Sequence, residues 1–141
     1  MKCLSFFFAV VFPQILFSQN VLGKWKTIDD VSGEAKAIVH IYEEQGKVYG
    51  EIIEIFNPST KHKRCTLCKG KLKDQPLIGM VFMYDLKKDG KEYNDGHVVD
   101  PKTGKEYDCY ITLKDDNTLK VRGYIGISLV GRTQYWQRLQ H

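Results

Sequence analysis

Residues 107–125 read YDCYITLKDDNTLKVRGYI, and their pattern decides the fold class. On either side of the turn at 115–117, apolar side chains recur at every second position. Cys109, Ile111 and Leu113 share one face of the first arm, and Asp108, Tyr110 and Thr112 share the other. A period of two over both arms, with a short polar turn between them, predicts an antiparallel hairpin.

The same period extends over the rest of the chain. Strands are expected at 22–28, 35–43, 47–56, 78–86, 92–99, 107–113, 119–125 and 129–139. Short turns such as Gln45-Gly46 join most of them, and no stretch of a dozen residues has a helical period. We expect an all-β fold: a single up-and-down antiparallel barrel of about eight strands, which hides strand edges most completely. A sandwich of two sheets is the alternative.

The first 18 residues are typical of a secretory signal peptide, with one lysine, an apolar run, then small and polar residues. The run from Cys3 to Phe12 is shorter than the ~20 residues of a membrane span. We expect cleavage near Ser18 and a single exported domain at 19–141, with no transmembrane segment in the mature chain. The formal charge is +4, but basic residues gather around 61–73 without interleaved aromatics, so nucleic acid is not an expected partner.

Four motifs carry a resemblance to a known family. They are VLGKWKTIDDVSGEAKAIVHIYEEQGKVYGEI (21–52), CTLCKGKLKDQPLIGM (65–80), VVDPKTGKEYDC (98–109) and LKVRGYIGISLVGRTQYWQR (119–138). In order and spacing they resemble the domain of unknown function family 2147, which consists of small exported bacterial proteins. The resemblance implies a lipocalin-like barrel, periplasmic or secreted, with no catalytic residues or cofactor to carry over. The long C-terminal helix of a typical lipocalin is not expected.

The two ends of the chain suggest how the barrel closes. Gly23 and Trp25 resemble the G-x-W of lipocalin first strands, and Arg138 falls in the last expected strand. A guanidinium on an indole face contributes about 0.5 to 2 kcal/mol. We expect Arg138 to stack on Trp25, with Trp136 as a second candidate partner.

The C-x-x-C at Cys65 and Cys68 lies in the one long loop expected, 57–76. A thiol oxidoreductase places this motif at a helix N-terminus, although the flanking lysines could still lower a thiol pKa. Zinc needs four ligands, and only Cys109, His62 and His97 could complete a set, none at motif spacing. In an oxidising compartment we favour a local disulfide between Cys65 and Cys68 over a longer bridge to Cys109, and we expect no metal site.

No arrangement of nucleophile and base is visible in the sequence, so we expect no enzyme, with thiol redox activity the remaining exception. The leading hypothesis is a small apolar or amphipathic ligand held inside the barrel, where aromatic walls and a few polar groups suit such molecules. The ligand-binding candidates are Tyr49, Phe82, Tyr84, Tyr107, Arg122, Arg132 and Tyr135. An inward arginine needs a carboxylate from the protein or from a ligand. The alternative is a packed barrel in an envelope interaction protein whose basic loop, 61–73, contacts an anionic surface or another protein. The oligomeric state stays open.

Overall fold

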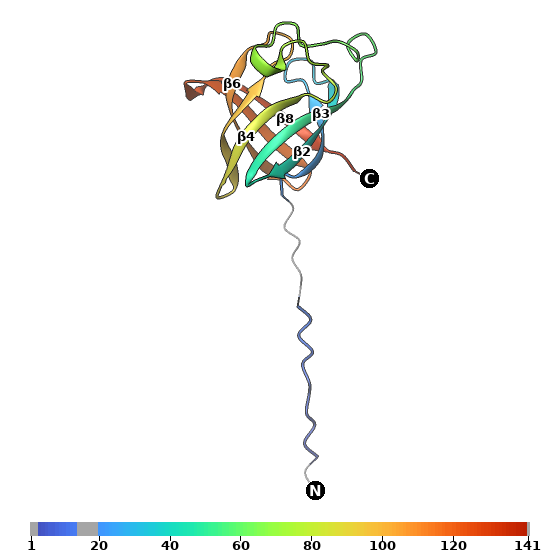
Figure 1. The fold of residues 1–141 in the computed structure, drawn as a ribbon. Coiled ribbons are helices and arrows are strands. Elements are labelled where there is room, and N and C mark those ends of the chain that lie inside the picture. The colour runs from blue at the N-terminus through green and yellow to red at the C-terminus, as the bar shows by residue number, and fades with distance from the viewer. Residues whose placement is uncertain (1–2, 14–19, 141) are drawn as a thin grey trace.

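The computed structural model describes residues 3–13 and 20–140. Its strands are β1 (Gly23–Ile28), β2 (Ala35–Glu44), β3 (Lys47–Ile55), β4 (Val81–Asp89), β5 (Glu92–Val99), β6 (Glu106–Asp115), β7 (Thr118–Ile125) and β8 (Ile127–Arg138). Each strand pairs antiparallel with the next, and β8 returns to β1. The predicted eight-stranded up-and-down barrel is confirmed, and a two-sheet sandwich is excluded (Figure 1).

The N-terminal segment 3–13 forms no helix or strand, and its side chains are exposed. The expected cleavage position near Ser18 lies outside the described residues. No helix in the described ranges has the length and apolar character needed to cross a membrane.

The strand boundaries follow the alternation closely, with one notable difference. β4 begins at Val81 and not at residue 78, because Gly79 has a φ of 92° and interrupts the extended backbone before it. The preceding loop also contains a 3₁₀ turn, η1 (Gly70–Leu72), which the alternation does not predict.

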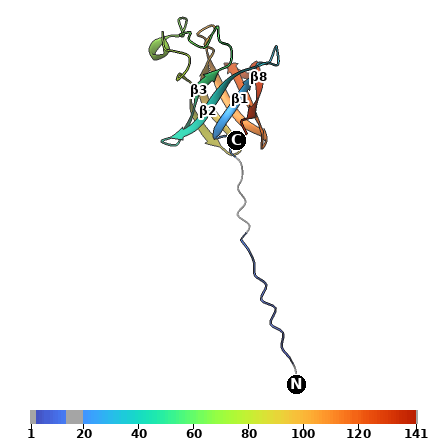
Figure 2. The same cartoon turned by 90° about the vertical axis from the view of Figure 1, so that its right-hand side faces the viewer.

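Connections fall alternately at the two ends of the barrel, because every strand reverses the direction of the one before it. One end carries the segments 29–34, 56–80 and 100–105 and the turn at Gly126, and we call it the apical end. The opposite, basal end carries the short turns near residues 45, 90 and 116, the start of β1 and the end of β8. The apical loops are uppermost in Figures 1 and 2, and segment 56–80, which we call the long loop, is the largest of them.

The barrel interior holds the hydrophobic core. Its fully buried members include Trp25, Val39, Ile41, Val48, Met83, Leu86, Cys109, Ile111 and Leu119. They belong to one cluster, to which β8 adds Trp136 and against which the partly buried Val98 of β5 packs, so every strand contributes. The period of two therefore reports burial correctly: one face of each strand lies inside the barrel and the other faces outward.

Candidate functional site

The basal end of the barrel is closed by Arg138. Its guanidinium carbon lies 4.3 Å from the centre of the Trp25 ring, and the two residues are paired across β1 and β8. The same guanidinium donates hydrogen bonds to the carbonyls of Asp116, Leu22 and Asn20 at 2.7, 3.2 and 2.6 Å. The Trp25 indole donates to the carbonyl of Val21. This end is therefore a structural seal.

Trp136, the second candidate for stacking on Arg138, has different neighbours. Its ring centroid lies 6.3 Å from that of Phe82 on the facing strand β4, and its indole nitrogen donates to the Gln134 side chain at 2.8 Å. Phe82 lies at a β-bulge, because Met83 pairs with Gly50 while Val81 pairs with Glu51. Because of the bulge, Phe82 does not follow the regular alternation of faces and points inward. The rings of Phe82 and Trp136 both lie in the barrel interior.

A polar chain continues from Trp136 toward the apical end on the inner face of β8. Gln134 donates to Asp30 at 3.1 Å, and Arg132 donates two hydrogen bonds to the same carboxylate at 2.8 and 2.7 Å. The Asp30 side chain is only 19% exposed, although it belongs to the exposed loop 29–34. Burial raises the pKa of Asp30, but the hydrogen bonds from Arg132 and Gln134 outweigh it and hold that pKa below 3.8. The carboxylate that pairs with the inward Arg132 is thus that of Asp30, a residue of the protein itself.

Four ligand-binding candidates lie on the outer face of the barrel and cannot line its interior. Tyr49 stacks on Tyr42 with ring centroids 5.6 Å apart, and Tyr84 lies against His97 at 5.3 Å. Tyr135 is 46% exposed. Arg122 donates to the Ser128 carbonyl and the Thr133 hydroxyl and not to a carboxylate. Their places follow from register, since the inward positions beside them are Val48, Gly50, Val121, Gly123 and Trp136.

Tyr107, Phe82 and Arg132 are the candidates on the inner face. Tyr107 pairs with Val98 on β5, beside the inward Cys109, and Lys105 lies over its ring at 5.5 Å. Phe82 belongs to the core cluster, and Arg132 belongs to the Asp30 chain described above. A ligand inside the barrel therefore stays a prediction.

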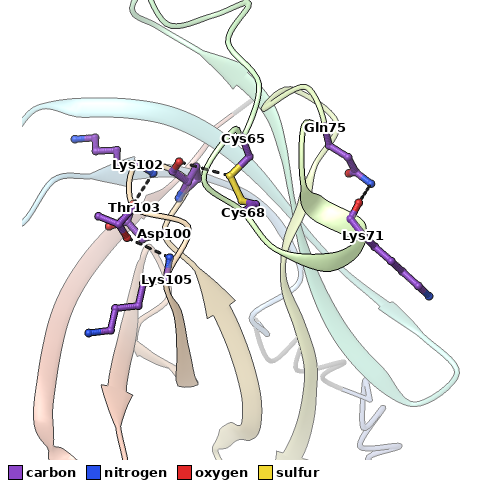
Figure 3. The surroundings of a disulfide bond; sticks show 9 residues. Cys65, Cys68, Lys71, Gln75, Asp100, Lys102, Thr103 and Lys105 are labelled. Carbon is purple, nitrogen blue, oxygen red and sulfur yellow. Dashed lines mark hydrogen bonds between the residues drawn. A yellow bond between two sulfur atoms is a disulfide. The ribbon is translucent and has the colours of Figure 1, made fainter.

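The long loop is folded back on itself as a small hairpin. Arg64 and Pro76 form an isolated β-bridge, Cys65 and Gln75 share a backbone hydrogen bond of 2.8 Å, and Asp74 donates to the carbonyl of Cys65 at 2.9 Å. A disulfide joins Cys65 and Cys68, whose Cα atoms are 5.3 Å apart (Figure 3). Both cysteines are buried, and they belong to the core cluster. A segment without strand pattern is thus held in one conformation.

The disulfide loop docks on the turn between β5 and β6. The sulfur of Cys65 lies 3.6 Å from the carbonyl oxygen of Pro101, a packing contact because a bridged sulfur has no proton to donate. A Cβ atom at Gly104 would overlap the carbonyl oxygen of Leu67, and the φ of Gly104 is 72°. Only glycine meets both conditions, since other residues disfavour this backbone region and carry a Cβ.

A cavity of about 630 Å³ lies between the docked loop and the outer face of β4 to β6. We call it the lysine groove. Its lining residues are Lys69, Lys71, Leu72, Val81, Tyr84, Val99, Gly104, Lys105 and Glu106. The lining therefore combines three lysines and one glutamate with apolar and aromatic residues. In Figure 3, Lys71 on the loop and Lys105 on the turn lie on either side of the disulfide.

Sequence reasoning misses both the groove and the role of Asp30. In the sequence alone the lysines look like a solvated run, and Asp30 like one of several acidic residues near turns. Asp30 and Arg132 are 102 residues apart, and the groove unites three segments of the chain. No local signal in the sequence reports such juxtapositions.

A second cavity, of about 460 Å³, lies at the basal end beside Arg138. It is lined in part by Leu22, Gly23 and His40. The Arg138 guanidinium that borders it is already occupied by three carbonyls and the Trp25 ring. Among residues 3–13 and 20–140, no group of three His, Cys, Asp or Glu side chains is placed to hold a metal.

The remaining thiol of the barrel has no access to solvent. Cys109 is fully buried and unbridged, and burial raises its pKa to about 12. A thiol of this kind is almost wholly protonated near neutral pH and is a poor nucleophile.

Comparison with known proteins agrees with this geometry. A family model described as "Uncharacterized protein conserved in bacteria (DUF2147)" matches residues 23–138. The chain belongs to this family. The predicted membership is confirmed, and the matched range of DUF2147 spans all eight strands, from Gly23 in β1 to Arg138 in β8.

The DUF2147 barrel is also similar to a solved structure. This is protein HP1028 from the human pathogen Helicobacter pylori, described as belonging to the lipocalin family. The two share 24% sequence identity, the alignment covers 87% of this chain and 85% of the other, and the TM-score is 0.76. At this identity the likeness concerns the fold, which is lipocalin-like. No curated protein matches the chain.

Proposed function

We propose that this DUF2147 protein is an exported, non-enzymatic, lipocalin-like protein that binds a small amphipathic anion in the lysine groove. The observation that carries the proposal is the composition of that groove, in which Lys69, Lys71 and Lys105 border an apolar floor. Its volume of about 630 Å³ falls within the roughly 300–1,000 Å³ of small-molecule sites.

The chemistry of the groove selects the ligand class. Leu72, Val81 and Val99 offer apolar surface, Tyr84 adds an aromatic ring, and the ammonium groups attract a carboxylate, sulfonate or phosphate. Glu106 is the one acidic group in the lining, and it disfavours a ligand with a second negative charge near it. A molecule with one anionic head and a short apolar body fits best.

Two features support export. The leader pattern of the first 18 residues is that of a secretory signal. The disulfide between Cys65 and Cys68, which holds one wall of the groove, is of a kind that persists in oxidising compartments. A reduced loop would lose this constraint on the groove.

The test uses 1-anilinonaphthalene-8-sulfonate, a fluorescent amphipathic anion, with the mature protein, and decanoate as a competitor. Changing Lys71→Glu and Lys105→Glu together should weaken binding of both molecules by roughly tenfold or more, since two favourable charges become unfavourable. The matched control is Lys87→Glu with Lys88→Glu, a pair exposed near the basal end of β4. Circular dichroism verifies the fold of each variant. Unchanged affinity for decanoate in the groove variant would exclude this site.

A further inference from the structure

The hairpin between β7 and β8 presents large apolar side chains to solvent. Ile125 is 46% exposed, Ile127 60%, Leu129 86% and Val130 56%. We call residues 125–130 the apolar hairpin. In Figure 1 it projects beyond the barrel wall at the apical end, near the label of β6. A cluster of four exposed apolar side chains is typical of a surface that contacts a membrane or another protein.

The apolar hairpin is held in its exposed position by specific contacts. Tyr124 pairs with Gly131, but Ile125 pairs with Ile127, so residues 128–130 bulge out of the ladder. Arg122 secures this bulge with two hydrogen bonds to the Ser128 carbonyl, at 3.1 and 2.7 Å, and one to the Thr133 hydroxyl at 3.0 Å. The exposure is therefore part of the fold.

The other apical loops add exposed apolar side chains of their own. Val31 in loop 29–34 is 83% exposed, and Leu67 and Phe56 in the long loop are 59% and 39% exposed. Within residues 20–140, the remaining large hydrophobic residue that is exposed is Tyr135, on the outer wall of β8. Exposed apolar groups are thus concentrated at one end of the barrel.

Positive charge is concentrated at the same end. The long loop carries six basic residues, Lys61, Lys63, Arg64, Lys69, Lys71 and Lys73, and one acidic residue, Asp74. All seven are exposed. Among the residues that the structure describes, the four ion pairs are Lys36–Glu34, Lys47–Asp85, His97–Asp108 and Arg132–Asp30, so none involves these six cations. Their charge is available to an external partner.

We propose that the apical end docks on an anionic lipid bilayer, with the apolar hairpin inserted at the level of the headgroups and the basic residues of the long loop against lipid phosphates. Two attractions hold peripheral proteins on membranes. Apolar side chains enter the headgroup interface, and lysines contact anionic headgroups. Because the apolar residues occupy three separate loops with charges between them, they suit a fluid, deformable surface. A protein partner would favour one contiguous apolar face.

This docking does not depend on the lysine groove. Lys61, Lys63 and the apolar hairpin are not among the groove residues, so the two proposals can fail separately. The experiment measures cosedimentation of the mature protein with vesicles of phosphatidylcholine alone and with vesicles containing about one third phosphatidylglycerol. The expected result is binding to the anionic vesicles that is at least roughly tenfold tighter than to the neutral ones and that weakens as salt is raised.

Variants identify the surface. Two double variants should each reduce vesicle binding roughly tenfold. One combines Ile127→Asp with Leu129→Asp, and the other combines Lys61→Glu with Lys63→Glu. The matched control for charge is Lys87→Glu with Lys88→Glu, and the matched control for exposed apolar surface is Tyr135→Ser. Both should bind vesicles as the parent protein does. A Leu129→Trp variant adds a fluorescent reporter to the hairpin, and its emission should shift to shorter wavelength on anionic vesicles, relative to the parent.

Three results would overturn the proposal. The first is that the protein binds both vesicle types equally or binds neither. The second is that the Ile127→Asp, Leu129→Asp variant binds vesicles as tightly as the parent. The third is that the emission of the Leu129→Trp variant does not shift on vesicles that bind the protein. Sedimentation velocity without lipid distinguishes a second copy as the occupant: concentration-dependent dimers that the Leu129→Asp change abolishes would assign the hairpin to self-association instead.

Discussion

Arg138 and Trp25 close the barrel across the junction of its last and first strands. The guanidinium carbon lies 4.3 Å from the indole ring centre, and three backbone carbonyls receive its hydrogen bonds. One side chain thereby ties together β8, the turn before β7 and the residues that lead into β1. No other residue type offers a planar cation with five donors.

Replacing Arg138→Lys should lower the free energy of unfolding by about 2 kcal/mol, because lysine keeps the charge but loses the fork of hydrogen bonds. Urea denaturation followed by tryptophan fluorescence measures the change. Arg64→Lys is the control, since Arg64 is exposed and donates to a single carbonyl, that of Asp74. A loss at position 138 no larger than at position 64 would contradict the role given to the seal.

Gly104→Ala should release the disulfide loop from the β5–β6 turn. The added Cβ would overlap the Leu67 carbonyl, and alanine disfavours the φ of 72°. We expect a loss of about 1–3 kcal/mol in the free energy of unfolding. Hydrogen exchange should rise in the long loop and in 100–105, while Gly90→Ala, a turn glycine with positive φ and open space around it, leaves the long loop protected. Equal exchange in the two variants would refute the docking.

Removing the disulfide with Cys65→Ala and Cys68→Ala should cost about 1–2 kcal/mol, because a bridge across three residues constrains the unfolded chain only slightly. The more sensitive readout is local. Amides of 60–77 should exchange faster, while those of β6 and β7 stay unchanged. If the whole barrel exchanged faster, the disulfide would stabilise the whole barrel and not only the long loop.

Asp30→Asn should lower stability at neutral pH by about 1 kcal/mol, a modest value because Arg132 is 63% exposed. The folded pKa of Asp30 lies below the ordinary 3.8, so its stabilisation is complete above that value and is lost as pH falls through the folded pKa. Stabilities of parent and variant should therefore converge in acid. A difference that stays constant from neutral pH to about pH 2 would show that the carboxylate charge contributes nothing.

Cys109 should resist alkylation by iodoacetamide in the folded mature protein at about pH 8, since only the thiolate reacts and the pKa of this buried thiol is about 12. In denaturant the same thiol should react fully, as intact mass measurement will show. Rapid modification without denaturant would mean that the interior opens readily, and would restore thiol chemistry as a candidate activity.

Much of the fold could be predicted because it rests on local alternation. Cys109, Ile111 and Leu113 repeat at every second position, and the structure buries the first two completely and packs Leu113 against the core. The faces of other strands could not be assigned in the same way. Tyr49 and Tyr84 resemble pocket residues in composition, yet pairing with Tyr42 and His97 places them outside. Phe82 turns inward only because of a β-bulge, and no residue pattern in the sequence predicts that bulge.

The sequence by itself determined the period of two and the short turns, because these features depend on neighbouring residues. The stacking of Arg138 on Trp25 was predicted from the resemblance of Gly23 and Trp25 to the G-x-W of lipocalin first strands. The tertiary structure decided what meets across the chain. Asp30 reaches Arg132 over 102 residues, the lysine groove combines the long loop with three strands, and the apolar hairpin shares an end with the basic loop. Such contacts depend on strand register and loop docking, which are set by the packing of the whole core and not by any single segment.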